Sequence, residues 1–125
     1  MLTIEGMNVD FITECVVHMC ECLGIEVPNI HIFVDDTIKP NGACYENSPN
    51  DFMVVLKSQD IGQMLVTLAH EMTHVKQFMK NNLSAHFDNK IPYMERWWEK
   101  EAYEMEVVIT KSLIEYVKIK LDKLE

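Results

Sequence analysis

The segment from Ser58 to about Lys80 constrains the fold more than any other part of this chain, because it reads as a long helix with two different faces. Its apolar residues recur at intervals of three and four, the spacing of one side of an α-helix. Ser58 or Asp60 can cap its start, and two asparagines end it. We expect the helix to lie against a core along its apolar side, which is formed by Ile61, Met64, Leu65, Leu68, Met72, Val75 and Met79.

The opposite side of the same helix carries the pattern H-E-x-x-H, from His70 to His74. Two imidazoles four residues apart lie one helical turn apart on one face and can bind the same Zn²⁺ ion. The glutamate between them, Glu71, can be held beside the metal without binding it, where it can take a proton from a zinc-bound water. The alternative is a pair of exposed histidines on a solvated face. The motif favours a zinc site with His70 and His74 as ligands and Glu71 as the general base.

The remaining pattern predicts an α+β fold in one domain, residues 1–125. Amphipathic spacing predicts an N-terminal helix over Asn8–Leu23, which Gly24 ends. The further elements expected are strands at 30–34, 43–46 and 52–56, a polar connection at 81–92 and a long C-terminal helix at about 93–124. Because the connections between the strands are too short for parallel crossovers, we predict a short three-stranded antiparallel sheet.

Composition excludes several classes of protein. The 125 residues are 48% hydrophobic and 25% charged, as in ordinary globular domains. The net charge is −9 and Arg96 is the only arginine, so binding to nucleic acid is disfavoured. The longest apolar stretches, such as 52–56, are too short to span a bilayer. Residues 1–10 lack the features of a signal peptide, and we expect a cytoplasmic protein with reduced thiols.

Three of the four cysteines, Cys15, Cys20 and Cys22, lie within the predicted N-terminal helix. His18 and Cys22 are four residues apart, so this pair also has the spacing of two metal ligands. Cysteines close together on one helix have poor geometry for disulfides. Free cysteine is usually a small apolar residue that packs inside a protein. Packing is therefore the preferred interpretation of this cluster.

A catalytic zinc ion needs a third protein ligand and one position open to solvent. One source is the acidic start of the last helix, Glu99-Lys100-Glu101-Ala102, where helical periodicity does not separate Glu99 from Glu101. For either carboxylate the alternative is a solvated side chain at a helix start. His86, in the polar connection, is a further candidate, and a solvent-exposed imidazole is its alternative. The residues themselves leave these three candidates open.

An H-E-x-x-H helix followed at a distance by a helix with E-x-x-A resembles the gluzincin clan of zincin metallopeptidases, most closely the minigluzincins, over about residues 28–106. The chain is also similar to the ImmA/IrrE-type regulatory proteases, whose segment reads E-x-x-A-N where this chain has Tyr103. Gln77 and Lys80 stand where the metzincin pattern needs Gly and His, which excludes that class. The resemblance implies a minimal zincin core and a zinc-dependent peptidase. The zinc ligands that it implies are His70, His74 and Glu99, with Glu71 as the general base.

The resemblance also implies that a peptide or protein substrate lies antiparallel to an exposed edge strand, for which residues 41–45 are the best candidate. The alternative is an ordinary edge strand that is kept short against aggregation. A donor that stabilises the oxyanion is expected near the metal, but the sequence does not choose among the candidates. These candidates are Tyr45, His86, Tyr93, Arg96 and Tyr103.

Two other functions remain open at this point. The chain could be a zinc-stabilised or latent regulatory or binding module without peptidase turnover. It could also be a small helical interaction protein that binds no metal. The C-terminal stretch 111–125 alternates apolar and charged residues at helical spacing. It could dock on the body of the protein, bind a partner helix or, as in latent relatives of the resembling families, block the cleft.

Overall fold

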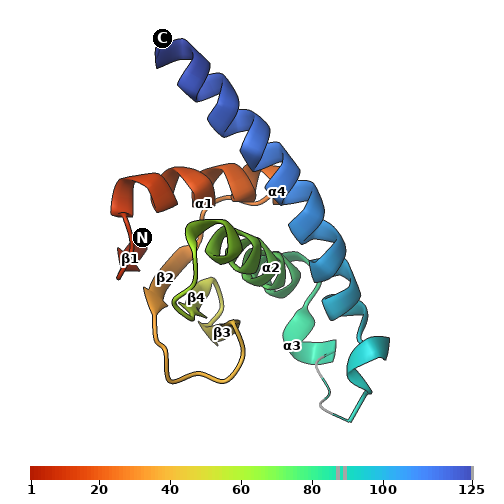
Figure 1. Ribbon diagram of the computed structural model, residues 1–125. Coiled ribbons are helices and arrows are strands. Elements are labelled where there is room, and N and C mark those ends of the chain that lie inside the picture. The colour runs from red at the N-terminus through yellow and green to blue at the C-terminus, as the bar shows by residue number, and fades with distance from the viewer. Residues whose placement is uncertain (87, 89, 125) are drawn as a thin grey trace.

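The structure is a computed structural model that describes residues 1–86, 88 and 90–124. A four-stranded sheet and the long helices make up most of it (Figure 1). In chain order the elements are β1 (Leu2–Glu5), α1 (Val9–Leu23), β2 (Asn29–Val34), β3 (Gly42–Ser48), β4 (Asp51–Leu56), α2 (Ile61–Lys80), α3 (Leu83–His86), the 3₁₀ helix η1 (Tyr93–Glu95) and α4 (Trp97–Leu124). The expected α+β class is confirmed, as is a long C-terminal helix.

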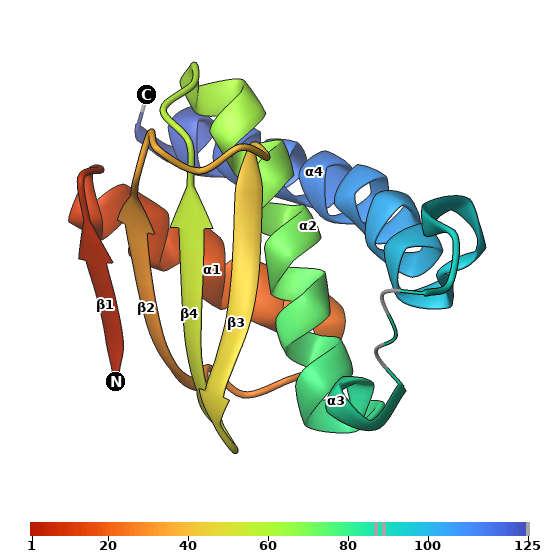
Figure 2. The ribbon, with the colours of Figure 1, turned by 90° about the horizontal axis from the view of Figure 1, so that it is seen from below.

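The sheet has the strand order β1-β2-β4-β3, which Figure 2 shows face-on. β1 and β4 both run parallel to β2, and β3 runs antiparallel to β4 at the edge of the sheet. The prediction of a three-stranded antiparallel sheet is therefore wrong. A short connection can join parallel strands here because β3 itself lies within it: the chain leaves β2, passes along the edge as β3 and turns back into β4 beside β2.

The strand that sequence analysis missed is β1. It is only four residues long and is followed by Gly6, whose φ of +83° suits glycine. Helix α1 then carries the chain across one face of the sheet to β2, so that β1, α1 and β2 form a parallel βαβ unit. Ile4 is buried, and it extends the core beneath α1.

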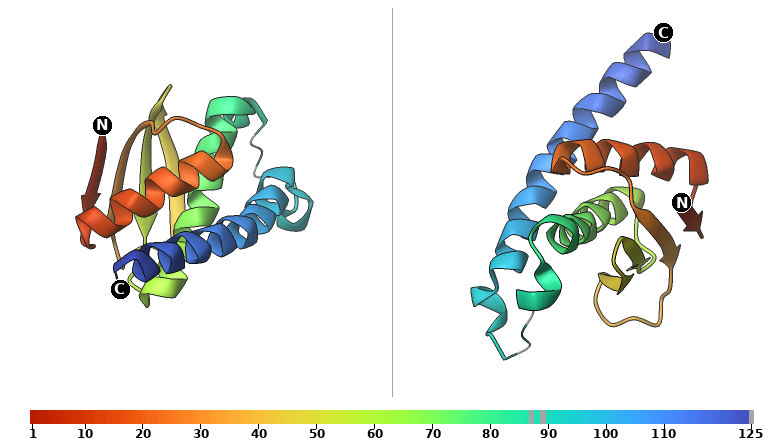
Figure 3. Two further views of the ribbon diagram at one scale, coloured as in Figure 1. Left: turned by 90° about the horizontal axis from the view of Figure 1, so that it is seen from above. Right: turned by 180° about the vertical axis from the view of Figure 1, so that it is seen from behind.

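Helix α2 is covered on two sides. Its capping residue is Asp60, whose side chain accepts a hydrogen bond from the backbone N–H of Gln63 at 3.0 Å. Its apolar side packs on β3, β4 and α1, and α4 runs along the side away from the sheet (Figure 3). As a result the side that carries His70 and His74 is an interface between α2 and α4.

The chain after α2 is more structured than expected. Residues 83–86 form a helical turn within the predicted polar connection, and α4 begins at Trp97 rather than at Tyr93. Its far end projects past α1, where Lys120 pairs with Glu14 (Figure 1). Within the described part of the chain, no helix has the length and apolar character needed to cross a membrane.

Candidate metal centre

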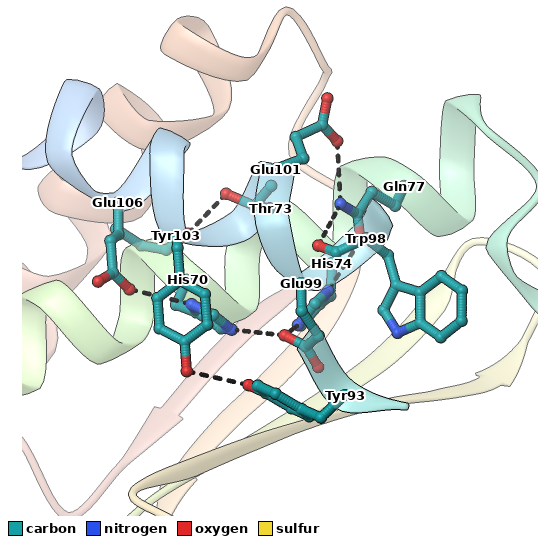
Figure 4. Close-up of polar contacts among 11 residues, drawn as sticks. His70, Thr73, His74, Gln77, Tyr93, Trp98, Glu99, Glu101, Tyr103 and Glu106 are labelled. Carbon is teal, nitrogen blue, oxygen red and sulfur yellow. Dashed lines mark hydrogen bonds and ion pairs between the residues drawn. The ribbon is translucent and has the colours of Figure 1, made fainter. Parts of the chain in front are cut away.

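Three side chains from α2 and α4 converge on one point (Figure 4). The Nε2 atom of His70 lies 3.0 Å from Glu99 Oε1, and the Nε2 atom of His74 lies 3.1 Å from the same oxygen. One candidate ligand atom from each residue can be chosen so that all three lie within 4.8 Å of one another. Among the described residues this is the one group of three or more His, Cys, Asp or Glu side chains that could hold a metal ion.

The other nitrogen of each imidazole has its own partner. His70 Nδ1 lies 2.9 Å from Glu106 Oε2, and His74 Nδ1 lies 2.8 Å from Gln77 Oε1. The amide nitrogen of Gln77 donates at 2.9 Å to the carbonyl of Trp98 and at 2.9 Å to Glu101 Oε1. Because both of these partners are acceptors, the amide oxygen of Gln77 is left to accept from His74. The imidazole of His74 therefore carries a proton on Nδ1, whereas His70 faces a carboxylate from each of its two nitrogens.

A neutral histidine at the convergence point can offer a lone pair to a cation. When Nδ1 carries the proton, as the contact with Gln77 indicates for His74, the Nε2 atom presents its lone pair toward the carboxylate of Glu99. Lone pairs and a carboxylate repel one another unless a positive charge lies between them. Two imidazole nitrogens and one carboxylate oxygen are also the ligand set of several catalytic zinc sites. The donor chemistry thus fits a divalent zinc ion.

The carboxylate of Glu71 lies beside this group in a confined place. Glu71 is only 6% exposed, and it lines the same cavity as His70, His74 and Glu99. Strand β3 approaches it closely at Gly42, where an added Cβ would lie 2.6 Å from Thr67 Cγ2 and 3.3 Å from Glu71 Oε2. A glycine is needed at this position so that the edge strand can reach the carboxylate.

Burial and charge set the proton affinities of these groups. Burial by itself would lower the pKa of His70 and of His74, but hydrogen bonds with Glu99 and the charge of Glu71 outweigh it, and both pKa values are raised. Burial would raise the pKa of Glu99, yet hydrogen bonds with the two imidazoles lower it to about 2. Burial raises the pKa of Glu71 in spite of the nearby imidazoles. Glu99 therefore stays ionised, while Glu71 has an increased affinity for a proton.

The structure separates the three candidates for the third ligand. Glu99 lies at the convergence point, whereas Glu101 lies outside the converging group, where it pairs with Lys76 at 3.1 Å and accepts from Gln77. His86 lies against the ring of Trp97, with 6.0 Å between ring centroids, and is not part of the converging group. Sequence reasoning missed Glu106 and the role of Gln77. Each of them contacts the Nδ1 atom of one histidine, on the side of the ring away from Glu99.

Tyr93 and Tyr103 lie beside the converging group. The hydroxyls of Tyr93 and Tyr103 lie 2.9 Å apart, and the ring of Tyr103 packs edge-on against His70 with centroids 4.7 Å apart (Figure 4). Of the other candidate oxyanion donors, Arg96 donates from Nε to the carbonyl of Ile91, and Tyr45 is 48% exposed. Tyr93 is the one candidate donor among these that lines both cavities beside the site.

Comparison with protein family models, with curated proteins and with solved structures found no match to this chain. The resemblance to gluzincins therefore rests on the motifs themselves, H-E-x-x-H and E-x-x-A, and on the way the fold brings them together.

Proposed function

We propose that this protein is a zinc-dependent peptidase of the gluzincin type, with zinc held by His70, His74 and Glu99. The observation that carries the proposal is the convergence of two Nε2 atoms and one carboxylate oxygen beside the buried carboxylate of Glu71. All four side chains line one cavity of about 300 Å³. A purely structural metal site needs no such cavity and no fourth, acidic side chain beside the ligands.

The residues of the chain have distinct tasks in this proposal. Bound zinc would supply Lewis acidity, which polarises a peptide carbonyl and lowers the pKa of water. Glu71, with its raised pKa, accepts the proton of the attacking water and then delivers it to the leaving amine. Glu106 and Gln77 hold the imidazoles so that both Nε2 atoms face the same point. Tyr93, which lines the same cavity, would donate a hydrogen bond to the developing oxyanion.

The edge strand β3 is suited to hold a peptide substrate. The carbonyl of Asn41 accepts from the N–H of Lys57 on the neighbouring chain segment at 2.8 Å. Because successive residues of an antiparallel strand alternate in direction, the N–H and C=O groups of Gly42 and Cys44 point to the open edge. Both residues line the cavity that also contains Glu71. A peptide that adds to this edge would pass directly over the proposed reaction centre.

A zinc-stabilised or latent module without turnover is the alternative function. The metal would then serve to join α4 to α2, since its ligands come from both helices. Blocking by the C-terminal stretch finds no support among the described residues, because none after Glu106 lines either cavity beside the site. The presence of Glu71 within the cavity favours the enzyme over the module.

The proposal is tested by the Glu71→Gln variant, assayed with zinc-loaded protein on a peptide mixture from a digested cell lysate, with new termini identified by mass spectrometry. We expect Glu71→Gln to keep its zinc, because Glu71 is not a ligand. Its cleavage rate should fall by at least roughly a hundredfold, the contribution of a general base.

The matched control is Glu104→Gln, the same chemical change at an exposed position on α4, which should alter neither zinc content nor cleavage. Undiminished cleavage by Glu71→Gln would remove Glu71 from the mechanism. A wild-type protein that holds zinc but cleaves no peptide in the mixture would overturn the proposed activity and favour the module.

A further inference from the structure

The proposed reaction centre lies where two cavities of different character meet. One has a volume of about 300 Å³ and the other about 240 Å³. Their shared walls are Pro40, Gly42, His70, Glu71 and Tyr93. A peptide bound across His70 and Glu71 would therefore place one side chain in each cavity, on opposite sides of the bond to be cleaved.

The first cavity is largely apolar beyond the shared walls. Away from the metal-binding group it is formed by Phe78, Leu83 and Trp98, together with Ala43 and Cys44 of β3. Leu83 and Trp98 are each 2% exposed and firmly packed, so the accessible apolar surface comes from the half-buried Phe78, Ala43 and Cys44. Such a surface favours an aliphatic or aromatic side chain, because burial there removes apolar area from water on both partners.

The second cavity is polar and acidic. Its own walls include Glu106, Gln63, Thr67 and Asn41, whose side chains offer oxygen acceptors. Among the described residues that line it there is no lysine or arginine. The carboxylate of Glu106 uses Oε2 for His70, and a carboxylate can accept further hydrogen bonds. This arrangement favours a positively charged side chain, since a charge-assisted hydrogen bond forms in a partly buried place.

The direction of the substrate follows from β3. The second cavity contains Asn41 and Gly42 at the start of the strand, and the first cavity continues to Cys44 further along it. A peptide that pairs antiparallel with β3 runs from the Cys44 end toward the Gly42 end. Its residues before the cleaved bond then lie in the apolar cavity, and its residues after that bond lie in the acidic cavity.

We infer that the preferred substrates are peptides with a large apolar residue immediately before the cleaved bond and a lysine or arginine immediately after it. This inference rests on the proposed peptidase function. It concerns specificity, and it can be tested at Gln63, a residue of the acidic cavity that has no part in the proposed reaction. This side chain is exposed at the mouth of the acidic cavity, which makes it replaceable without disturbing the core.

The test uses four synthetic peptides of one sequence that differ only at the two central residues: Leu-Lys, Leu-Glu, Lys-Leu and Glu-Leu. Zinc-loaded wild-type protein should cleave the Leu-Lys peptide between the two central residues. Its rate on this peptide should exceed that on Leu-Glu by about tenfold, as expected for one buried ionic contact. The variant Gln63→Lys adds a cation to the acidic cavity, so the ratio of the Leu-Lys rate to the Leu-Glu rate should fall by about tenfold or invert.

Gln59→Lys is the matched control, because Gln59 does not line the acidic cavity, and its ratio should equal that of the wild type. Zinc content and circular dichroism of both variants should match the wild type. Equal rates on all four peptides, preferred cleavage of Lys-Leu, or an unchanged ratio in Gln63→Lys would each overturn the inference while leaving the peptidase function in place. Cleavage of none of the peptides, together with none in the lysate-derived mixture, would overturn both.

Discussion

Two helices of this protein each carry a pair of potential metal ligands four residues apart, and α4 packs against both pairs. On α2 the pair is His70 and His74, and α4 contributes the carboxylate of Glu99. On α1 the pair is His18 and Cys22, and the polar group that α4 contributes is the hydroxyl of Ser112, at 2.9 Å from His18 Nε2 and 3.5 Å from Cys22 Sγ. Equal spacing thus leads to two different environments.

The difference shows what the spacing itself leaves undecided. At the α1 pair a neutral hydroxyl can donate to one group and accept from another, so no extra charge is needed, and the imidazole of His18 stacks on Tyr116. At the α2 pair, Glu106 and Gln77 contact the Nδ1 atoms of the imidazoles, and the Nε2 atoms face the carboxylate of Glu99. Converging lone pairs around one point, more than the presence of ligand-type residues, define a metal site.

The largest effect is expected from removing one imidazole of each pair. His74→Ala should reduce the zinc content of the purified protein from about one ion per chain to near zero, because two ligands do not hold zinc in competition with a weak chelator. His18→Ala should leave the zinc content unchanged. Elemental analysis after dialysis measures both. Equal losses in the two variants would contradict the distinction drawn between α1 and α2.

The two acidic residues at the start of α4 sharpen the comparison further. Glu99→Gln should weaken zinc affinity by more than about a hundredfold, which exceeds the usual effect of residues that only orient ligands. Glu101→Gln, the same change two residues away, should leave zinc affinity close to that of the wild type. The carboxylate of Glu101 pairs with Lys76, and the amide oxygen of the variant can still accept from Gln77, which also donates to the carbonyl of Trp98. Competition with a fluorescent zinc chelator gives both affinities. If Glu101→Gln weakened zinc binding more than Glu99→Gln, the third ligand would be Glu101 and the assignment to Glu99 would be wrong.

A smaller effect is expected from the side chain behind His70. Glu106→Gln keeps a hydrogen-bond acceptor near Nδ1 but removes the charge that supports the imidazole. Zinc affinity should fall by about ten- to a hundredfold, the range found for such outer partners. Glu104→Gln, exposed on the same helix, serves again as the control. An affinity equal to that of the wild type would show that Glu106 does not orient the ligand.

The smallest and most gradual effect is that of pH. The pKa values of His70 and His74 are raised from the ordinary value of 6.5. Protons therefore begin to compete with zinc at a higher pH than they would at an ordinary histidine. Zinc affinity should therefore decline as pH falls, by up to about tenfold per pH unit for each imidazole once both are protonated. Glu99, with a pKa of about 2, adds nothing to this decline in the neutral range.

The stability of the zinc-free protein should depend on pH in the opposite direction to its zinc affinity. A raised pKa means that the folded state binds protons more tightly, so the imidazoles stabilise it below the unfolded pKa. This contribution is lost as pH rises through the folded pKa values. Denaturant unfolding of zinc-free protein across this range should show it. Zinc affinity that rises on acidification would contradict the assignment of the imidazoles as ligands.

Much of the helical structure could be predicted from local patterns. The start of α2, most of its apolar side and the end of α1 at Gly24 follow from caps and periodicity that are visible in the sequence. Ile61 and Met79, at the two ends of the predicted apolar side, are exposed. The sheet could not be predicted in the same way. Parallel pairing of β2 with β4 depends on where β3 inserts, and β1 is too short to stand out. These are long-range choices that no local window contains.

The residues of the candidate site likewise fall into two groups: those that local spacing predicts and those that depend on how the helices pack. H-E-x-x-H identified the pair on α2 because helical spacing alone places its histidines together. The distinction between Glu99 and Glu101 depends on the rotation of α4 against α2, which packing decides. The contacts of Glu106 with His70 and of Gln77 with His74 lie in the interface between α2 and α4. They could not be predicted without knowing that these two helices pack together.

The most direct test of the account is a crystal structure of zinc-loaded protein with the metal identified by anomalous scattering. We predict one zinc ion within about 2.0–2.2 Å of Nε2 of His70, Nε2 of His74 and a carboxylate oxygen of Glu99, with a fourth position open to the cavity. A fourth ligand from the protein in that position would contradict the proposed enzyme. The absence of an ion between these three side chains would contradict the metal centre itself.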